Sequence, residues 1–407
     1  MSEAANAVRD YPGYDADLFT ADALLNPYPH YDAIRELGPV VRINDQNDLN
    51  VLALARHQDV LTALQTPEIL ISSHGTGFNK LVNRKLEYPG VLNSDGERHR
   101  MMRMPLMKYL FPVALRPMRQ PMRDMIDAKV AGLVGGSTVD AIPEIAAHLP
   151  INAVSDLVGL PEEHRAKMAH WSAASFNVIG PLERDGKIMP ELEPDLAAAG
   201  EVIEYIHNLD PAILRPGSWS AELFQEVRDG GMSLADARVS LRAFILPSLD
   251  TTINATGNLL CSLGENPDQY ELLRKDPSLI PSAVSEGMRH STIVRWFSRL
   301  AVADYQAGDV FVPSGERVML MFGAANRDPR KYPNPAKFDV TRNPTSQLGW
   351  SAGPHVCAGQ HLARMEMEAT LEALVKHVAR IEIDEPVRPP NRGALAITSL
   401  PMRLFAS

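Results

Sequence analysis

Cysteine is rare in this chain of 407 residues, which contains only Cys261 and Cys357. Cys357 stands in the stretch SAGPHVCAGQ, where glycine and proline favour a tight turn. The run CAGQHLARMEMEATLEALVKHV has the pattern of an amphipathic helix. Because backbone N–H groups at a helix N-terminus stabilise negative charge, this cysteine is suited to be a thiolate. A thiolate serves as a metal ligand or as a nucleophile.

Other interpretations of Cys357 remain open at this point. A free cysteine is often a small buried apolar residue without chemistry. A zinc site shared with His361, four residues further on, would need two more ligands, and no second cysteine lies nearby in the sequence. A cysteine nucleophile needs a histidine base, which sequence spacing alone does not identify.

The stretch LGWSAGPHVCAGQHLAR resembles the haem-binding loop of cytochromes P-450, whose pattern is Phe-Gly-x-Gly-x-His-x-Cys-x-Gly followed by Leu-Ala-Arg. The positions that match are Gly353, His355, Cys357, Gly359, Leu362, Ala363 and Arg364. Trp350 stands where phenylalanine is usual, and Ser351 stands where glycine is usual. The resemblance implies a haem b cofactor whose iron has Cys357 as its axial thiolate, within a loop that includes Trp350 and Gly359.

Three further charged residues resemble the buried ion network of the same family. Glu286 and Arg289 form the Glu-x-x-Arg pair in EGMR, and Arg342 ends the segment PAKFDVTR. The spacing of the pair places both charges on one face of a helix. Taken alone, such a pair is also typical of a solvated helix surface.

Four residues match family positions that hold the haem propionates. They are His99 and Arg103 in SDGERHRMMR, Arg299 in RWFSRL, and His355 in the cysteine loop. Each is individually typical of a surface charge, but these segments occur together and in the family's order. The sequence is therefore identified as a member of the cytochrome P-450 family.

The segment RAFILPSLDTTINATGN lies in a long helical pattern and resembles the oxygen-activating segment of the family. Asp250 and Thr251 match the acid–alcohol pair, which implies that they deliver protons during oxygen activation. Family members usually have Ala-Gly or Gly-Gly just before this pair, whereas this chain has Pro247 and Ser248. Proline removes a helical hydrogen bond and kinks the helix, so we expect an opening of the helix by another route.

The chain as a whole resembles bacterial class I enzymes that oxidise para-substituted benzoic acids. The resemblance is carried by SLDTTIN, GAANRDPRKY, EALVKHVARIEI and ITSLPMRL together with the haem loop. It implies hydroxylation or O-demethylation of a small aromatic acid. The positions that it assigns to the substrate pocket are Arg242, Ala243, Leu246, Phe176, Ile179 and Phe297.

Several polar anchors of those relatives are replaced here. Leu86 and Pro89 stand in place of Arg and Ser, Ala243 and Leu246 in place of serines, and Ile179 and Ser298 in place of aromatic residues. Arg242 is retained near the carboxylate end of the pocket, and Arg84, Lys85 and Arg295 are candidates for a rebuilt grip on the carboxylate. A pocket for a neutral small molecule is the alternative.

The resemblance also implies partners. No flavin or iron–sulfur module lies within these residues, so we expect electrons from a separate ferredoxin and its reductase, with O₂ and a small molecule as substrates. The candidates for a basic docking patch on the cysteine side are Lys108, Arg116, Arg119, Arg123 and Arg364. Two alternatives are a haem-binding sensor or carrier without efficient turnover, suggested by Pro247 and Ser248, and peroxide-driven oxygenation without electron partners.

Composition narrows the class of protein. The chain is 45% hydrophobic and 22% charged, as globular proteins are, and its net charge of −10 argues against general nucleic-acid binding. The first residues have no apolar signal core, and no run approaches the roughly 20 apolar residues of a membrane span. The scarcity of cysteine fits a reducing compartment, so we expect a cytoplasmic protein without a membrane anchor.

The elements that must position these residues are mostly helical. Helical patterns cover 97–131, 142–178, 192–208, 233–262, 267–276, 278–290 and 358–379, with interruptions at Pro112, Pro117 and Pro121. Residues 299–320 alternate between turns and strands, residues 380–407 form short strands, and 72–94 form a long loop. We expect a mainly α fold with small β-sheets, the cytochrome P-450 fold, as a single domain over 1–407.

Overall fold

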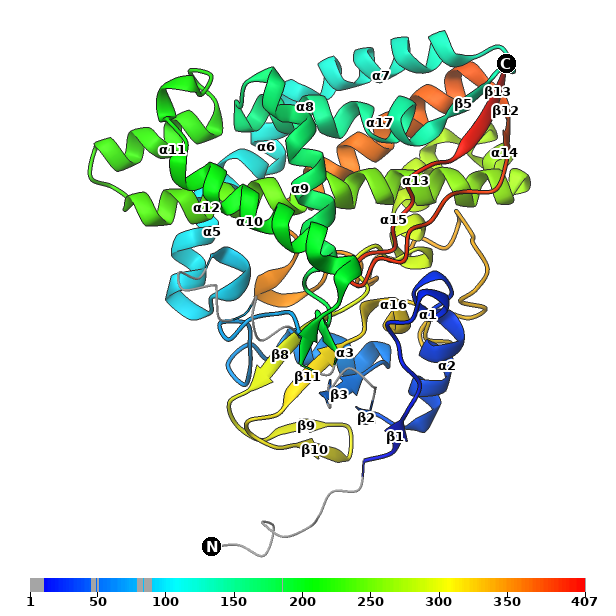
Figure 1. Cartoon of the computed structure of the whole chain (residues 1–407). Coiled ribbons are helices and arrows are strands. Elements are labelled where there is room, and N and C mark those ends of the chain that lie inside the picture. The colour runs from blue at the N-terminus through cyan, green and yellow to red at the C-terminus, as the bar shows by residue number, and fades with distance from the viewer. Residues whose placement is uncertain are drawn as a thin grey trace, which may run out of the picture.

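The chain folds into a large helical part and a smaller part built around a β-sheet (Figure 1). The computed structural model describes residues 11–44, 49, 51–78, 83, 90–184 and 186–406. The cysteine loop leads into α17 (Gln360–His377), which lies in the helical part (Figure 1). This mainly helical architecture with small sheets confirms the fold class expected from the sequence.

Some helices begin at a capping side chain or at a proline. Ser233 caps α12 (Leu234–Ser248) by accepting a hydrogen bond from the N–H of Asp236 (3.0 Å), and Pro267 is the first residue of α14 (Pro267–Lys275). The other helices of this part are α5 (Gly96–Leu110), α6 (Pro112–Leu115), α7 (Arg119–Leu133), α8 (His148–Val158), α9 (Arg165–Asn177), α10 (Glu193–Asn208), α11 (Trp219–Arg228) and α15 (Ile280–His290).

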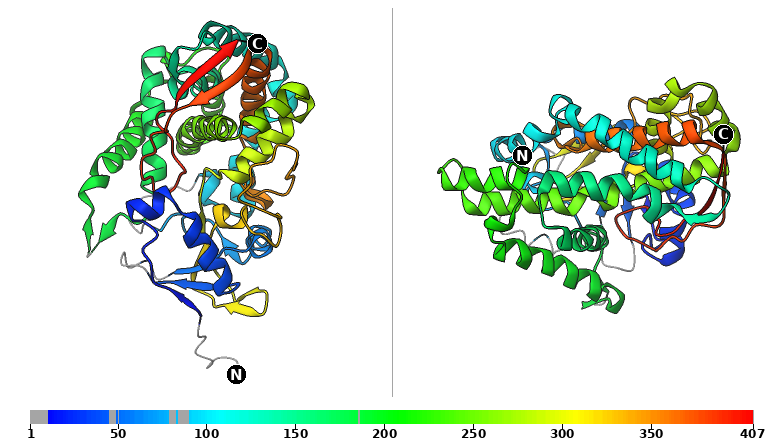
Figure 2. Two further views of the ribbon diagram at one scale, coloured as in Figure 1. Left: turned by 90° about the vertical axis from the view of Figure 1, so that its right-hand side faces the viewer. Right: turned by 90° about the horizontal axis from the view of Figure 1, so that it is seen from above.

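The helices α12 (Leu234–Ser248), α13 (Asp250–Glu265) and α14 (Pro267–Lys275) follow one another along the chain. The first two pass through the middle of the helical part, as the left view of Figure 2 shows. α12 packs against α5, α8, α9, α10 and α11, whereas α13 packs against α9, α14 and α15. The buried side chains of α12 and α13 are therefore surrounded by several other helices.

The main sheet has six strands in the order β1-β2-β3-β11-β8-β4. β1 pairs with β2 and β3 with β11 in parallel, and the other neighbours are antiparallel. The strands are β1 (Gly13–Tyr14), β2 (Val41–Ile43), β3 (Val51–Leu54), β4 (Leu70–Ile71), β8 (Phe297–Ala301) and β11 (Arg317–Leu320).

The sheet is buried on both faces because its side chains alternate between two apolar clusters. Leu52 and Leu54 of β3 pack with residues of α3 (His57–Leu64) and of β9–β10, whereas Val51 and Ala53 pack with residues of α2 (Tyr28–Leu37). The short helices α1 (Ala21–Leu25) and α16 (Phe322–Ala325) contribute to the same clusters.

The remaining strands form three small sheets. β9 (Tyr305–Ala307) and β10 (Val310–Val312) form a hairpin, as do β6 (Glu183–Arg184) and β7 (Lys187–Ile188). The third sheet has the order β12-β13-β5 and joins β12 (Val378–Ile383), β13 (Pro401–Ala406) and β5 (Thr138–Asp140).

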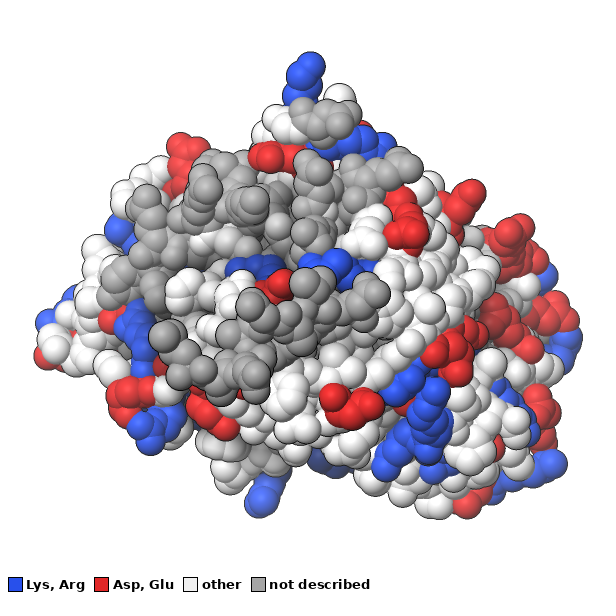
Figure 3. Space-filling view, turned by 90° about the horizontal axis from the view of Figure 1, so that it is seen from below, with Lys and Arg blue, Asp and Glu red and all other residues white. Residues whose placement is uncertain are grey.

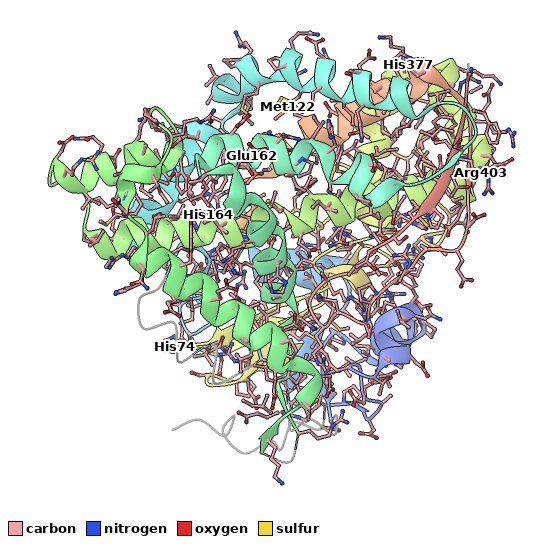
Figure 4. The ribbon with its side chains drawn as sticks, turned by 45° about the horizontal axis from the view of Figure 1, so that its top comes forward. His74, Met122, Glu162, His164, His377 and Arg403 are labelled. Atoms are coloured by element: carbon pink, nitrogen blue, oxygen red, sulfur yellow. The ribbon has the colours of Figure 1, made fainter. Side chains whose placement is uncertain are left out.

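Two helices of the upper layer, α7 and α17, lie side by side. Figure 4 labels Met122 on α7 and His377 at the end of α17. Nε2 of His377 lies 2.9 Å from a carboxylate oxygen of Asp127 on α7, and Lys376 donates to the same carboxylate at 2.8 Å. α17 is therefore fixed at its far end as well as at the cysteine loop.

Most of the sequence-based elements are confirmed, and the differences have identifiable causes. Residues 299–320 contain the strands β8 to β11, as their turns indicate. The segment 233–262, expected as one helical stretch, forms two helices that are separated at Leu249. The helix α11 was not expected from the sequence. In the expected loop over 72–94, residues 91–93 form a 3₁₀ turn, whereas most of 79–89 lies outside the described residues.

Two features of the described residues concern possible binding partners: the mixture of charges on one face, and the length and polarity of the helices. On the face seen in Figure 3, Lys and Arg alternate with Asp and Glu rather than forming one basic area. No helix within the described ranges combines the length and the apolar character that a membrane crossing requires.

Candidate functional site

The expected ion network is present and buried. Nε and Nη2 of Arg289 donate to the two carboxylate oxygens of Glu286, both at 2.7 Å, and both side chains are fully buried. Nε of Arg342 donates to Glu286 Oε1 at 3.2 Å. Nη1 of Arg289 also donates to the carbonyl of Asn326, whose side chain accepts a hydrogen bond from the N–H of Leu348 at 2.7 Å. The network thereby anchors the start of the cysteine loop.

The cysteine loop depends on backbone shapes that glycine permits. Gly353 has φ +66°, and a Cβ atom there would lie 2.2 Å from the carbonyl oxygen of Leu64, so a larger residue has no room. Ser351, at the position where relatives have glycine, has φ +62°, a conformation that costs an ordinary residue about 1 to 2 kcal/mol. The N–H of Cys357 donates to the carbonyl of Trp350 at 2.8 Å, which closes the loop.

The sulfur of Cys357 meets backbone N–H groups at the start of α17, as the sequence suggested. Burial raises the pKa of the Cys357 thiol, while N–H groups of Gly359 and Gln360 and the charges of Arg103 and Arg364 oppose that rise. A positive centre at the sulfur would complete the stabilisation of a thiolate. This donor set fits a metal held through a single thiolate.

The zinc alternative lacks ligands. No group of three or more His, Cys, Asp or Glu side chains within the described ranges is arranged to hold a metal ion. Cys357 and His361 therefore have no tetrahedral ligand set there. The other cysteine, Cys261, is buried on α13, and burial raises the pKa of its thiol to about 11.

The four residues matched to propionate binding converge beside the cysteine loop. The rings of His99 and His355 lie 4.3 Å apart, and Nη2 of Arg103 donates to the carbonyl of Val356 at 2.6 Å. Arg299 is buried, and burial lowers its pKa to about 10. The pKa of His99 is lowered to about 4 by burial and by the neighbouring charges of His355 and Arg103.

This cluster fits an anionic group. Nε2 of His99 is buried and has no hydrogen-bond partner among the described residues. An unsatisfied buried polar atom costs free energy, and here it lies among cationic side chains. The carboxylates of a haem would satisfy both the unpaired nitrogen and the excess positive charge.

Asp95 belongs to this cluster but was missed by the sequence analysis. Its carboxylate accepts hydrogen bonds from the N–H groups of Ser72 (3.0 Å) and Ser73 (2.8 Å) and lies 3.5 Å from Nε2 of His355. Burial alone would raise its pKa, but these hydrogen bonds outweigh burial and lower it to about 2. Its side chain does not cap α5, which begins one residue later, so its position before that helix gave no signal of these partners.

Trp350 occupies the position of the usual phenylalanine. It is buried, and its indole N–H has no hydrogen-bond partner in the part of the chain that the structure describes. The guanidinium of Arg364 lies 5.3 Å from the centre of the indole ring, within cation–π distance. The ring therefore packs between the loop and α17.

Asp250 and Thr251 stand at the break between α12 and α13. Oγ1 of Thr251 donates to the carbonyl of Pro247 at 2.7 Å, and Nδ2 of Asn254 donates to the carbonyl of Asp250 at 2.8 Å. Oδ2 of Asp250 is buried and unpaired within the described segments. Burial raises the pKa of Asp250 to about 6, against the opposing effect of Asn254. The break expected from Pro247 is thus present two residues further on, at Leu249.

The residues matched to the substrate pocket fall into two groups. Phe176, Leu246 and Ile179 pack in or against the helical core. Phe297 of β8 instead packs in the sheet cluster, edge-to-face with Phe322 at 6.0 Å, so the structure does not join it to Phe176 in one apolar cluster. Ala243 of α12 lies opposite Gly90, where a Cβ atom would be 4.0 Å away.

The candidates for binding a carboxylate lie in different surroundings. Arg242 is half-buried, and burial lowers its pKa. Arg295 donates from Nη2 to the carbonyl of Leu24 (2.6 Å) and from Nε to the carbonyl of Ala394 (3.0 Å), so these two groups already have partners within the fold. Ser298 is likewise engaged, with its hydroxyl bonded to the carbonyl of Gly77 at 3.0 Å. The positions Arg84, Lys85, Leu86 and Pro89 lie outside the described residues.

A groove of about 380 Å³ opens elsewhere, between α7, α8 and the start of α11. It is lined mainly by apolar side chains such as Met118, Met122 and Trp219. None of the residues matched to haem, proton or substrate binding lines it, so it is separate from the candidate site.

Comparisons with known proteins agree with the geometry. The family model described as Cytochrome P450 matches residues 218–404. The chain is 31% identical over 398 residues to cytochrome P450 CYP199A2 of Rhodopseudomonas palustris, covering 97% of this chain and 94% of the relative. It is also 31% identical to the beta-dihydromenaquinone-9 omega-hydroxylase of Mycobacterium tuberculosis, covering 91% and 74% of the two chains.

A solved structure shows the same fold. The structure of cytochrome P450-153 from Novosphingobium aromaticivorans matches with a TM-score of 0.82 and 24% identity, over 95% of this chain and 99% of that one. The 31% identity to CYP199A2 over nearly the whole chain, together with the family model, shows that the chain belongs to the cytochrome P450 family, the haem-thiolate monooxygenases.

Proposed function

We propose that Cys357 ligates the haem iron of this monooxygenase and that the enzyme hydroxylates or O-demethylates a small aromatic acid. The observation that carries the first part is the environment of the Cys357 sulfur. N–H groups of Gly359 and Gln360 and two arginines oppose the effect of burial there. Bound haem supplies the redox chemistry that activates O₂, and the thiolate donates electron density to the iron.

The haem propionates are held by His99, Arg103, Arg299 and His355 in this proposal. Asp95 orients His355 and offsets part of the positive charge of the cluster, and its own carboxylate is fixed by the N–H groups of Ser72 and Ser73. Trp350 and Gly359 complete the loop around the cysteine. The unpaired Nε2 of His99 is the atom that gains most from a propionate.

Asp250 and Thr251 supply protons for oxygen activation. A carboxyl group with a pKa of about 6 gains and loses protons readily near neutral pH, which suits a relay. The unpaired, buried Oδ2 of Asp250 is the atom that holds the proton. The hydroxyl of Thr251 donates to the Pro247 carbonyl and remains able to accept a hydrogen bond from a water molecule.

The substrate is proposed to be an aromatic ring that carries a carboxylate, with its para substituent toward the iron. Apolar side chains from several elements supply the walls, and a few polar groups orient the ligand, as in most small-molecule sites. The proposed walls are Phe176, Ile179, Ala243, Leu246 and Phe297. A carboxylate in such a pocket needs a cation, and Arg242, which lies beside Ala243 on α12, is the cation that we propose for this role.

Arg242→Ala tests this assignment. We expect it to weaken binding of 4-methoxybenzoate by at least about tenfold, the value of one charged hydrogen bond, with little effect on 4-methoxybenzamide. Binding is read from the haem absorption spectrum. Arg238→Ala is the matched control, because Arg238 lies on the same helix as Arg242, is likewise half-buried, and donates to the carbonyl of His207 on α10. Equal affinity of the parent protein for the acid and the amide would indicate a pocket for neutral molecules.

Electrons are proposed to come from a separate ferredoxin and its reductase. Two members of the expected basic patch form ion pairs, Lys108 with Glu222 and Arg123 with Glu372. Two other members, Arg116 and Arg119, are exposed. The exposed apolar side chains Met101, Met104 and Val113 lie on the neighbouring helices α5 and α6. Such a mixture of apolar and basic groups suits a transient protein partner that is acidic. Substrate-dependent NADH consumption with product analysis tests this coupling.

A further inference from the structure

The break between α12 and α13 leaves backbone groups on both sides of Leu249 without their helical partners, among them the carbonyl of Leu246 and the N–H of Asp250. In a regular helix the N–H of Asp250 donates to the carbonyl of Leu246, four residues earlier. Leu249 lies in a bend that no backbone hydrogen bond spans, although every residue from 246 to 253 is described. Pro247 has no N–H, which weakens the helix at the same place.

The hydroxyl of Ser172 occupies this gap. Its Oγ donates to the carbonyl of Leu246 at 2.6 Å and accepts a hydrogen bond from the N–H of Asp250 at 3.0 Å. The side chain is inserted between the two groups that would otherwise bond to each other. Insertion of a side chain into the helical ladder is a recognised cause of helix opening.

Ser172 belongs to a different element, α9, and lies 78 residues from Asp250 in the sequence. It is fully buried, and one side chain satisfies both backbone groups, since a hydroxyl is at once a donor and an acceptor. Phe176, a proposed wall of the substrate pocket, follows four residues later on the same face of α9.

We propose that Ser172 is a positioning residue for proton delivery. By holding the break open, its hydroxyl fixes the backbone of Asp250 and the neighbouring carbonyl of Pro247, to which Thr251 is bonded. It also ties the helix that contacts the substrate to the helix that carries the acid–alcohol pair. This inference rests on the roles proposed above for Asp250 and Thr251.

Without the hydroxyl, the two backbone groups are free to bond directly. The helix then closes at Leu249, and the carboxyl of Asp250 and the hydroxyl of Thr251 turn away from their present positions. We expect oxygen to be reduced without transfer to substrate, so that electrons from NADH leave as hydrogen peroxide.

The test compares Ser172→Ala with Ser220→Ala in the haem-loaded protein. Ser220 is a matched control because it is fully buried and its hydroxyl also donates to a carbonyl of another helix, that of Val158. With 4-methoxybenzoate, NADH, ferredoxin and reductase, Ser172→Ala is expected to lower product per NADH by about fivefold, the equivalent of one hydrogen bond. Peroxide release should rise, while the carbon monoxide spectrum and substrate affinity stay as in the parent.

Two further variants separate positioning from packing. Ser172→Thr keeps the hydroxyl and should retain more than about half of the parent's product per NADH, whereas Ser172→Cys, a poor donor of similar size, should resemble Ser172→Ala. A yield in Ser172→Ala equal to that of the parent, or an equal loss in Ser220→Ala, would overturn the inference.

A crystal structure of the haem-loaded Ser172→Ala protein gives a readout that does not depend on turnover. The N–H of Asp250 is expected to bond directly to the carbonyl of Leu246, with Thr251 displaced. An unchanged break at Leu249 would refute the role of Ser172 even if the parent showed no turnover of the chosen acid. Failure of the parent to oxidise 4-methoxybenzoate would count against the proposed substrate alone.

Discussion

Two buried carboxyl groups of this chain keep their protons at pH values where exposed carboxyl groups have lost them. Burial raises the pKa of Asp250 to about 6 and that of Glu366 to about 8. Oδ2 of Asp250 and Oε1 of Glu366 both lack hydrogen-bond partners within the described ranges. Burial thus suits the proton transfer that we propose for Asp250, whereas at Glu366 it lowers stability where the unfolded chain would ionise.

The pH dependence of product yield tests the role of Asp250. Below about pH 6 the buried carboxyl is protonated and able to give up its proton, and above it the proton is lost. We therefore expect product per NADH to fall as pH rises through about 6 and beyond. Asp250→Asn, whose side chain cannot titrate, should give a low product yield per NADH that does not change as pH rises through about 6.

Thr251→Ala removes the hydroxyl of the proposed pair and keeps the carboxyl of Asp250, so it tests the role of the hydroxyl alone. It should divert electrons from product to peroxide while haem and substrate still bind, and the pH step of Asp250 should persist. An unchanged product yield in Thr251→Ala, or a pH step that survives in Asp250→Asn, would remove these residues from proton delivery.

Stability measurements test the burial of Glu366. The folded state holds the proton of Glu366 up to about pH 8, whereas the unfolded chain loses it near the ordinary value of 4.5, so stability falls as pH rises between these values. Glu366→Gln should therefore become more stable than the parent by up to about 1.4 kcal/mol per pH unit across this range.

Urea denaturation of the haem-loaded proteins at several pH values measures the difference. Glu372→Gln, which changes an ion-paired and more exposed carboxylate on the same helix, is the control. A pH-independent difference between parent and Glu366→Gln would show that Glu366 is ionised in the folded protein.

At the scale of elements, the cysteine loop contains a conformational cost that relatives avoid. Ser351 has φ +62° in a position where the family usually has glycine. Ser351→Gly should raise the free energy of unfolding by about 0.5 to 1 kcal/mol, because relief of the left-handed strain exceeds the added freedom of the unfolded chain.

Thermal unfolding of the haem-loaded protein measures this gain. Ser314→Gly, at an exposed position with ordinary backbone geometry, should instead be neutral or destabilising. A loss of stability in Ser351→Gly would mean that the serine side chain makes a compensating contact.

Element by element, the sequence predicted what depends on local patterns. Glycines and the helix after Cys357 located the loop, alternation and turns located the hairpins of 299–320, and Pro247 located the helix break to within two residues. Asp95 and Ser172 were missed because their partners lie far away in the sequence. Asp95 contacts Ser72 and His355. Ser172 contacts Leu246 and Asp250. No local pattern reports such contacts.

At the scale of the whole molecule, the site depends on segments from most of the chain. α5 and β8 supply residues of the cationic cluster, and the loop before α17 contains Cys357, the proposed ligand. α9 and α12 contain proposed wall residues of the substrate pocket, and α12 ends at the helix break. The buried network of Glu286, Arg289 and Arg342 ties the last of these to the helical core. Loss of one member of such a network costs about 3 to 5 kcal/mol, so cofactor binding and folding are expected to be coupled.

The ligand of the haem iron is the central claim, and one spectrum tests it most directly. Carbon monoxide added to the reduced, freshly purified protein should give the strongly red-shifted Soret band of a thiolate-ligated haem, and Cys357→His should abolish that band. A haem–imidazole spectrum in the folded parent protein would contradict the assignment of Cys357.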